Sequence, residues 1–310
     1  MNDNIKISIV IPLYNKSKYI YKCLESVVAQ TCTEWECIIV DDGSTDDSAK
    51  IVTDFIELHP GRWTLLKQEN SGPSAARNLG ILNARGKYIA LLDADDLWFP
   101  EKLKVQADFM DHNPDIDLTI TNYLIFDSGA KANFRAVRSP GVNKLINRWL
   151  DMRGFGGLIE STGMLRRDFS SQQVLFDHKL VTTEGLDFMI RFSTQHKTKV
   201  IRRFLTLYRI SSGQLHKRED LIKMNAFKMV EKYFDLYPRT SQMNKYQSSY
   251  FFLSSLRGQK LGEVFLTVFR NLLRSDMRLI QMIFWILSRN IRAKVIPVST
   301  KKSMIRILGK

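Results

Sequence analysis

The sequence lacks several features that would assign a chain of 310 residues to a class at once. It has only three cysteines, Cys23, Cys32 and Cys37, whose spacing fits no zinc site and gives no support to an oxidised framework. It has no run of about 18 uncharged apolar residues, so no transmembrane helix is predicted. The polar stretch 1–6 leads straight into a strand pattern, so we expect no signal peptide. A reducing, cytoplasmic compartment fits these features best.

Two common nucleotide-binding motifs are also absent. No Gly-x-Gly-x-x-Gly follows the first predicted strand, which argues against a dinucleotide site of the usual kind. No Gly-x-x-x-x-Gly-Lys-Ser/Thr occurs either, which excludes a P-loop phosphate cradle.

Charge is distributed unevenly along the chain. Of the 46 Lys and Arg, 19 lie in residues 217–310 with only six Asp and Glu, so the other 27 nearly balance 26 acidic residues in 1–216. With 44% hydrophobic and 25% charged residues, the composition suits one large or two modest globular domains. The sequence therefore predicts a near-neutral domain, 1–216, followed by a basic, mostly helical C-terminal region, 217–310, that meets an anionic partner.

Strands and helices alternate at intervals of roughly thirty residues in the first hundred residues, the rhythm of βαβ units in a largely parallel sheet. Ser17 can cap the first helix, and Ser44 or Thr45 begins the second. Further along we expect a strand over 159–166, a helix over 183–195 and a strand over 199–210. The predicted early strands are 5–12, 36–40, 63–66 and 89–93, and the helix after the third strand is 73–84.

An apolar run from Ile89 to Leu92 ends on the carboxylates Asp93, Asp95 and Asp96. The C-terminal ends of parallel strands are where open α/β sheets bind ligands. Hard cations such as Mg²⁺ or Mn²⁺ bind carboxylate oxygens together with substrate phosphates. The alternative is that Asp96 caps a helix beginning near Trp98, with the other two carboxylates solvated in a loop.

Polar groups follow two other early strands as well. Pro12 to Tyr14 ends the first strand, and Asp41 with Asp42 ends the second. Since parallel strands point their C-terminal ends to one edge, we expect these groups and Asp93 to Asp95 to share one crevice.

Four motifs in this order resemble those of the family 2 glycosyltransferases of GT-A fold, over roughly residues 5–210. The resemblance implies a GT-A, Rossmann-like, mostly parallel sheet with flanking helices, and an inverting, metal-dependent enzyme that uses a nucleotide sugar. The motifs are Ser8 to Asn15, Val40 to Asp46, Asn70 to Asn78 and Leu92 to Asp96, the last resembling the metal-binding Asp-x-Asp.

The resemblance also implies roles for single residues in binding a donor, most simply a UDP sugar. Pro12 and Tyr14 would wall the base, and Asp42, beside Asp41, would accept the imide N–H of a uracil. Arg77 would lie near the pyrophosphate, whose geometry a guanidinium matches. In the metal motif, Asp93 would lie at the ribose and the cation, Asp95 would ligate Mn²⁺ or Mg²⁺, and His216 would complete the ligands.

The chain departs from the family pattern at the catalytic base. A Glu-Asp pair is usual there, but Gly185 follows Glu184. Glu184 is therefore the expected base and Asp187 the reserve, although pairing with Arg191 is the more ordinary role of Asp187. The departure leaves open an alternative, a weakened or inactive module that binds nucleotide sugars or glycans.

The partners that follow are a nucleotide-sugar donor and a glycan or lipid-linked acceptor, as in surface polysaccharide biosynthesis. The apolar segment Leu279 to Leu287, flanked by arginines, fits either a core helix or a helix in a membrane interface. We expect the basic region 217–310 to hold the protein peripherally on the inner face of the cell membrane. Nucleic acid is not expected, because the basic region lacks a recognised module and an acidic crevice repels phosphates.

Overall fold

The computed structural model describes residues 5–127, 134–141, 159–168, 175–180 and 183–210. The predicted ligand His216 and the region 217–310 lie outside these ranges, as does the predicted domain boundary between them. The strands are β1 (Ile7–Leu13), β2 (Trp35–Asp41), β3 (Trp63–Lys67), β4 (Tyr88–Leu91), β5 (Leu97–Trp98), β6 (Leu118–Asp127), β7 (Phe134–Val137), β8 (Gly163–Arg166) and β9 (Thr198–Ile210). The helices are α1 (Ile20–Val28), α2 (Ser48–Leu58), α3 (Pro73–Leu82), α4 (Lys102–His112), α6 (Glu184–Ser193) and the short 3₁₀ helix η1 (Glu160–Thr162).

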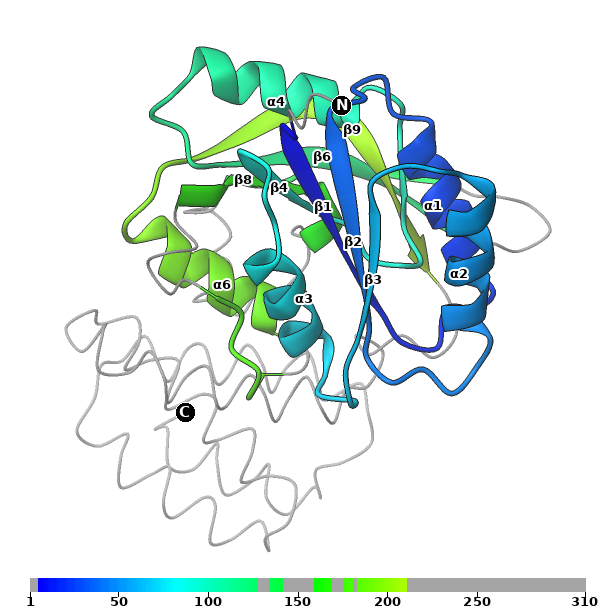
Figure 1. Cartoon of the computed structure of the whole chain (residues 1–310). Coiled ribbons are helices and arrows are strands. Elements are labelled where there is room, and N and C mark those ends of the chain that lie inside the picture. The colour runs from blue at the N-terminus through cyan, green and yellow to red at the C-terminus, as the bar shows by residue number, and fades with distance from the viewer. Residues whose placement is uncertain (1–4, 128–133, 142–158, 169–174, 181–182, 211–310) are drawn as a thin grey trace, which may run out of the picture. The chain divides into compact units, whose positions relative to one another are not determined.

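The strands form one sheet in the order β3-β2-β1-β4-β8-β6-β9-β5, with β7 paired to β6 (Figure 1). The strands β3, β2, β1 and β4 are mutually parallel, as the sequence rhythm predicts. Beyond them the sheet is mixed, because β8 runs antiparallel to both β4 and β6. The parallel half therefore directs four carboxyl ends to a single edge.

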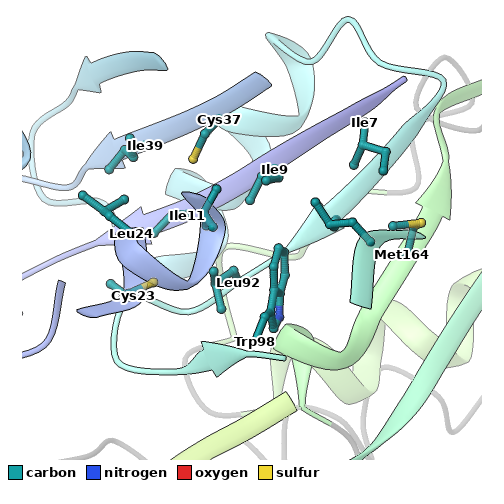
Figure 2. Close-up of a cluster of buried hydrophobic side chains, with 14 of the residues drawn as sticks. Ile7, Ile9, Ile11, Cys23, Leu24, Cys37, Ile39, Leu92, Trp98 and Met164 are labelled. Atoms are coloured by element: carbon teal, nitrogen blue, oxygen red, sulfur yellow. The ribbon is translucent and has the colours of Figure 1, made fainter. Parts of the chain in front are cut away.

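Helices cover both faces of the sheet, as expected for strands rich in Ile and Val on both sides. One apolar cluster joins β1 and β2 to α1, α2 and α4, and Figure 2 shows Ile11 of β1 beside Leu24 of α1. A second cluster joins the opposite face to α3 and α6, through residues such as Ile81 and Phe188. None of the described helices has the length and hydropathy needed to cross a bilayer.

Several predicted boundaries are wrong for identifiable reasons. Helix α1 begins at Ile20 without a side-chain cap, so Ser17 is not its N-cap. Helix α2 begins at Ser48, because the backbone at 44–46 is bonded to Asn15 and Asp41 instead. The predicted strand 159–166 divides into η1 and β8.

We predict that Gly80→Ala destabilises the fold. A Cβ at Gly80 would lie 2.4 Å from Cγ1 of Val10, where α3 packs on β1. Overpacking of this kind costs about 1–3 kcal/mol, whereas helix propensity alone would favour Ala by roughly 1 kcal/mol. Urea unfolding should show a lower free energy of unfolding for Gly80→Ala. Adding Val10→Ala to the same chain should partly restore it. The control Gly141→Ala, whose Cβ meets no atom within 4 Å, should leave stability unchanged. A Gly80→Ala chain as stable as the wild type would contradict this packing.

Candidate active site

The structure brings the polar strand ends together at the carboxyl edge of the parallel strands. In the β1–β2 register, Leu13 pairs with Asp41, and the Asp42 N–H donates to the Leu13 carbonyl at 2.8 Å. Strand β4 pairs with the other side of β1 up to Leu91, just before Asp93. The ends of β1, β2 and β4, with the residues that follow them, therefore lie along one edge of the sheet.

Asp42 fastens the start of α3 to this edge. Its Oδ1 accepts hydrogen bonds from the Gln68 side chain at 2.7 Å and the Ser71 N–H at 2.8 Å, and its Oδ2 accepts one from the Gly72 N–H at 2.9 Å. Gly72 has φ +89°, a conformation that favours glycine, and Pro73 then begins the helix. The Gly-Pro turn thus places Arg77 one turn inside a helix that points at the strand ends.

The loops after β1 and β2 are tied to each other through Asn15. Its side-chain oxygen accepts hydrogen bonds from the N–H groups of Thr45 at 2.8 Å and Asp46 at 3.3 Å. Asn15 has φ +51°, which Asn tolerates better than most residues. Beside it, Tyr14 is 45% exposed although it is aromatic, so a flat face is open to a ligand.

Arg77 is the charge centre of the site. Its guanidinium is buried and donates to Asp93 Oδ1 at 2.7 Å and to Glu184 Oε1 at 3.3 Å. Burial alone would lower the pKa of Arg77, but the charges of Asp93, Glu160 and Glu184 outweigh it and raise that pKa. One cation therefore binds Asp93 and Glu184 directly and also interacts electrostatically with Glu160.

Glu184, at the first position of α6, keeps unused bonding capacity. Among the described residues, its Oε2 and the Arg77 Nε are buried without a hydrogen-bond partner. Burial raises the pKa of Glu184 to about 7, Arg77 opposes the shift, and Glu160 adds to it. A carboxyl group with a pKa near neutrality can take and return a proton at working pH.

Asp187 lies one turn further along α6 and is engaged elsewhere. Its fully buried side chain pairs with Arg191, whose Nε and Nη2 lie 2.9 and 2.8 Å from Asp187 Oδ2. This i, i+4 pair is the ordinary structural role expected from the sequence. Of the two carboxylates proposed as base, Glu184 is thus the one within the Arg77 cluster.

The acidic turn after β4 separates into three environments. Asp93 meets Arg77, and Asp95 pairs with the Lys16 ammonium, which comes from the loop after β1. Asp96 is fully buried and accepts hydrogen bonds from Ser161 Oγ at 2.6 Å and the Arg209 N–H at 3.0 Å. Burial and the charges of Asp95 and Asp93 raise the pKa of Asp96.

The alternative for this turn, Asp96 as a helix cap near Trp98, is wrong. Trp98 lies in β5, and α4 does not begin until Lys102. Asp96 instead joins the turn to η1 and β9 through the bonds above. These hydrogen bonds, and not a helix N-terminus, offset the cost of burying the Asp96 carboxyl group.

A divalent cation fits the donor chemistry of this edge. Asp93 and Asp95 offer the hard carboxylate oxygens that Mg²⁺ and Mn²⁺ bind along with substrate phosphates. Within the described ranges no group of three or more His, Cys, Asp or Glu forms a ready-made cluster. Both carboxylates now contact cations of the chain, Arg77 and Lys16, so a metal would share or displace these partners.

Sequence reasoning missed Glu160, Ser161 and Lys16. Ser161 accepts from the Asp93 N–H at 3.0 Å and donates to Asp96, so η1 is bonded directly to the acidic turn. Glu160 and Ser161 come from the short helix η1 and Lys16 from the loop after β1, and neither segment has a periodic signal. The one available hint was Gly185, because a missing side chain leaves space that another must fill.

We predict that Arg77→Met costs roughly 3–5 kcal/mol in free energy of unfolding. The change leaves buried Glu184 and partly exposed Asp93 without their cation, as when one member of a buried ion pair is removed. Urea unfolding measures the loss, and Lys50→Met, which breaks an exposed pair with Asp54 on α2, is the matched control with little effect. If both variants lose the same small amount of unfolding free energy, the Arg77 ion pairs do not stabilise the site.

Comparison with known proteins agrees with this geometry. Glycosyl transferase family 2 matches residues 8–172. The minor teichoic acid biosynthesis protein GgaA of Bacillus subtilis is 32% identical over 198 residues, which are 61% of this chain and 44% of GgaA. The match spans between 18% and 72% of the length of the curated relatives, and less than half of most of them.

Solved structures share the fold. S. aureus TarS 1–349 in complex with UDP-GlcNAc superposes with TM-score 0.60 at 18% identity, covering 85% of this chain and 79% of that one. The mannosyltransferase PcManGT of Pyrobaculum calidifontis, in complex with GDP-Man and Mn²⁺, gives TM-score 0.57 at 15% identity. This match covers 98% of the present chain and 80% of PcManGT. The matched family, the sheet order and the strand-end motifs agree, and the chain belongs to the family 2 glycosyltransferases of GT-A fold.

Proposed function

We propose that this chain transfers a sugar from a UDP sugar, with inversion, to a glycan or lipid-linked acceptor of a surface polymer. The observation that carries the proposal is the cluster in which Arg77 joins Asp93 and Glu184 at the carboxyl edge of the sheet. The UDP-GlcNAc bound by TarS and the teichoic acid pathway of GgaA support a UDP donor and a polymer acceptor.

The donor is assigned to residues at the strand ends. The uracil packs against Pro12 and Tyr14, and Asp42 accepts its imide N–H. The Asp42 carboxylate has about four acceptor sites and uses three of them on the turn before α3, so one remains for the base. Asp93 meets the ribose, and Arg77 approaches the diphosphate.

Asp41 shapes the same binding surface from β2. Its Oδ1 accepts the Ser44 N–H at 3.1 Å, which fixes the turn that precedes α2. We assign it to the donor side because Asp42 follows it directly.

We assign Asp93 and Asp95 to Mn²⁺ or Mg²⁺, with His216 as a further ligand from outside the described residues. When bound, the cation neutralises the diphosphate as its bond to the sugar breaks. The Mn²⁺ in the PcManGT complex supports a divalent cation. Lys16 pairs with Asp95 and would neutralise that carboxylate when no metal and donor are bound.

Glu184 is assigned as the base that takes the proton of the acceptor hydroxyl, and Asp187 as a support for α6 through Arg191. The hydroxyl oxygen bonds to the anomeric carbon as the bond to the diphosphate breaks, and the electron pair leaves with the diphosphate. Direct displacement of this kind inverts the anomeric centre.

The experiment that tests the proposal is a screen of UDP and GDP sugars for hydrolysis with and without Mn²⁺. An active transferase releases nucleoside diphosphate slowly to water in the presence of the metal. Gly185 favours one alternative, a module that binds the nucleotide sugar without reaction. Such a module would bind UDP in calorimetry and release none from any donor.

The region 217–310 remains assigned to an anionic membrane surface that would present a lipid-linked acceptor. Basic side chains near such a surface contribute roughly 1 kcal/mol each, so a few of its 19 would suffice for reversible binding. Sedimentation of the full chain with anionic vesicles, with release at high salt, is the corresponding measurement.

We predict that Asp95→Asn weakens Mn²⁺-dependent UDP binding at least about tenfold while the fold persists. The change removes a ligand charge at a strand end and no core volume. Calorimetric titration of UDP with and without Mn²⁺ gives the affinities, and Asp54→Asn on exposed α2 is the control. Metal-dependent binding that survives unchanged in Asp95→Asn would remove Asp95 from the metal site.

We predict that the rate of UDP release by donor hydrolysis increases about tenfold with each pH unit as the pH is raised toward 7. Above pH 7 the rate should level off. The raised pKa of about 7 means that Glu184 holds its proton until neutrality and acts as a base only once it is lost. Glu184→Gln should abolish this rise and the release itself, yet keep UDP affinity. A rate that does not change between about pH 5 and pH 8 would exclude a carboxyl base of this pKa.

A further inference from the structure

Gly185 leaves room that another residue fills. A Cβ built on Gly185 would lie 1.8 Å from Glu160 Oε1 and 2.9 Å from its Cδ. The Glu160 carboxylate therefore occupies the space of a side chain at position 185.

Glu160 is held by a rigid support. Ser161, the next residue of η1, is bonded through its hydroxyl to the Asp93 N–H and to Asp96. The Ser161 carbonyl accepts the Trp98 indole N–H at 2.8 Å. The position of the Glu160 backbone is thus set by the same acidic turn that carries the proposed donor site.

Glu160 interacts electrostatically with the groups around Arg77. Arg77 is attracted to Asp93, Glu160 and Glu184 together, and the charges of Glu160 and Glu184 act on one another. Glu184 uses one oxygen on Arg77, and its side chain is only 10% exposed. As whole residues, Glu160 is partly exposed and Glu184 is buried.

We propose that Glu160 is a second catalytic carboxylate, delivered from η1 into the space beside Gly185, which contacts the acceptor hydroxyl together with Glu184. This inference rests on the proposed transferase function. The acceptor O–H proton passes to the carboxylate pair as its oxygen bonds to the anomeric carbon. The bond from that carbon to the diphosphate breaks, and its electron pair leaves with the diphosphate.

The first test is Glu160→Gln, which keeps the shape of the side chain and removes its charge. Because general base catalysis contributes roughly 10²–10⁴-fold, we expect kcat for Mn²⁺-dependent hydrolysis of UDP-GlcNAc, or of the UDP sugar that the screen identifies, to fall about 100-fold. The Kd for UDP should stay within about twofold, since the base serves the acceptor and not the donor. A kcat within about twofold of wild type would overturn the proposal.

The second test moves the carboxylate from position 160 to position 185. Gly185→Asp alone should be impaired, because the new side chain meets the Glu160 carboxylate. Glu160→Ala with Gly185→Asp supplies the carboxylate from α6 instead, and a cavity of about 20 Å³ lined by both residues allows repacking. We expect the double variant to regain at least about tenfold in kcat over Glu160→Ala. A double variant no faster than Glu160→Ala would mean that Glu160 acts only in packing.

A readout that does not need turnover separates this inference from the proposed function. Gly185→Ala should lower Tm in the wild-type chain and much less in Glu160→Ala, because only the former contains the clash. If the wild type releases no UDP from any donor, the transferase proposal and the catalytic role of Glu160 fail together. If the wild type is active and Glu160→Gln is equally active, only the inference about Glu160 fails.

Discussion

The Arg77 guanidinium is the interaction on which the site depends. Asp93 follows β4, Glu184 begins α6 and Glu160 lies in η1, and these carboxylates would repel one another without the shared cation. The Arg77 position follows in turn from Asp42, which bonds the turn before α3 to the end of β2. Sheet edge, helix start and charge cluster are thus one connected arrangement.

Much of this arrangement could be predicted from the sequence because it depends on local signals. Apolar β-branched runs ending on Asp41 and Asp93 identify strand ends, and parallel pairing brings strand ends to one edge. The Gly-Pro turn predicts the start of α3 and hence the placement of Arg77. The i, i+4 spacing of Asp187 and Arg191 likewise predicts their pairing.

The rest depends on contacts between residues far apart in the sequence. Ser161 binds the turn at Asp93 across 68 positions, and Arg209 reaches Asp96 across 113. No periodic pattern encodes such pairs, and neither does one encode Glu160 beside Gly185. A missing side chain is visible in the sequence, but the residue that occupies its space is visible only in the fold.

The central claim is that the carboxyl edge around Arg77 is the donor site. A crystal structure of the full chain with UDP and Mn²⁺ tests it most directly. The account predicts the uracil against Tyr14 with its imide N–H on Asp42, and the metal between the diphosphate and the carboxylates of Asp93 and Asp95. UDP bound away from this edge, or bound there with the metal on other residues, would contradict it.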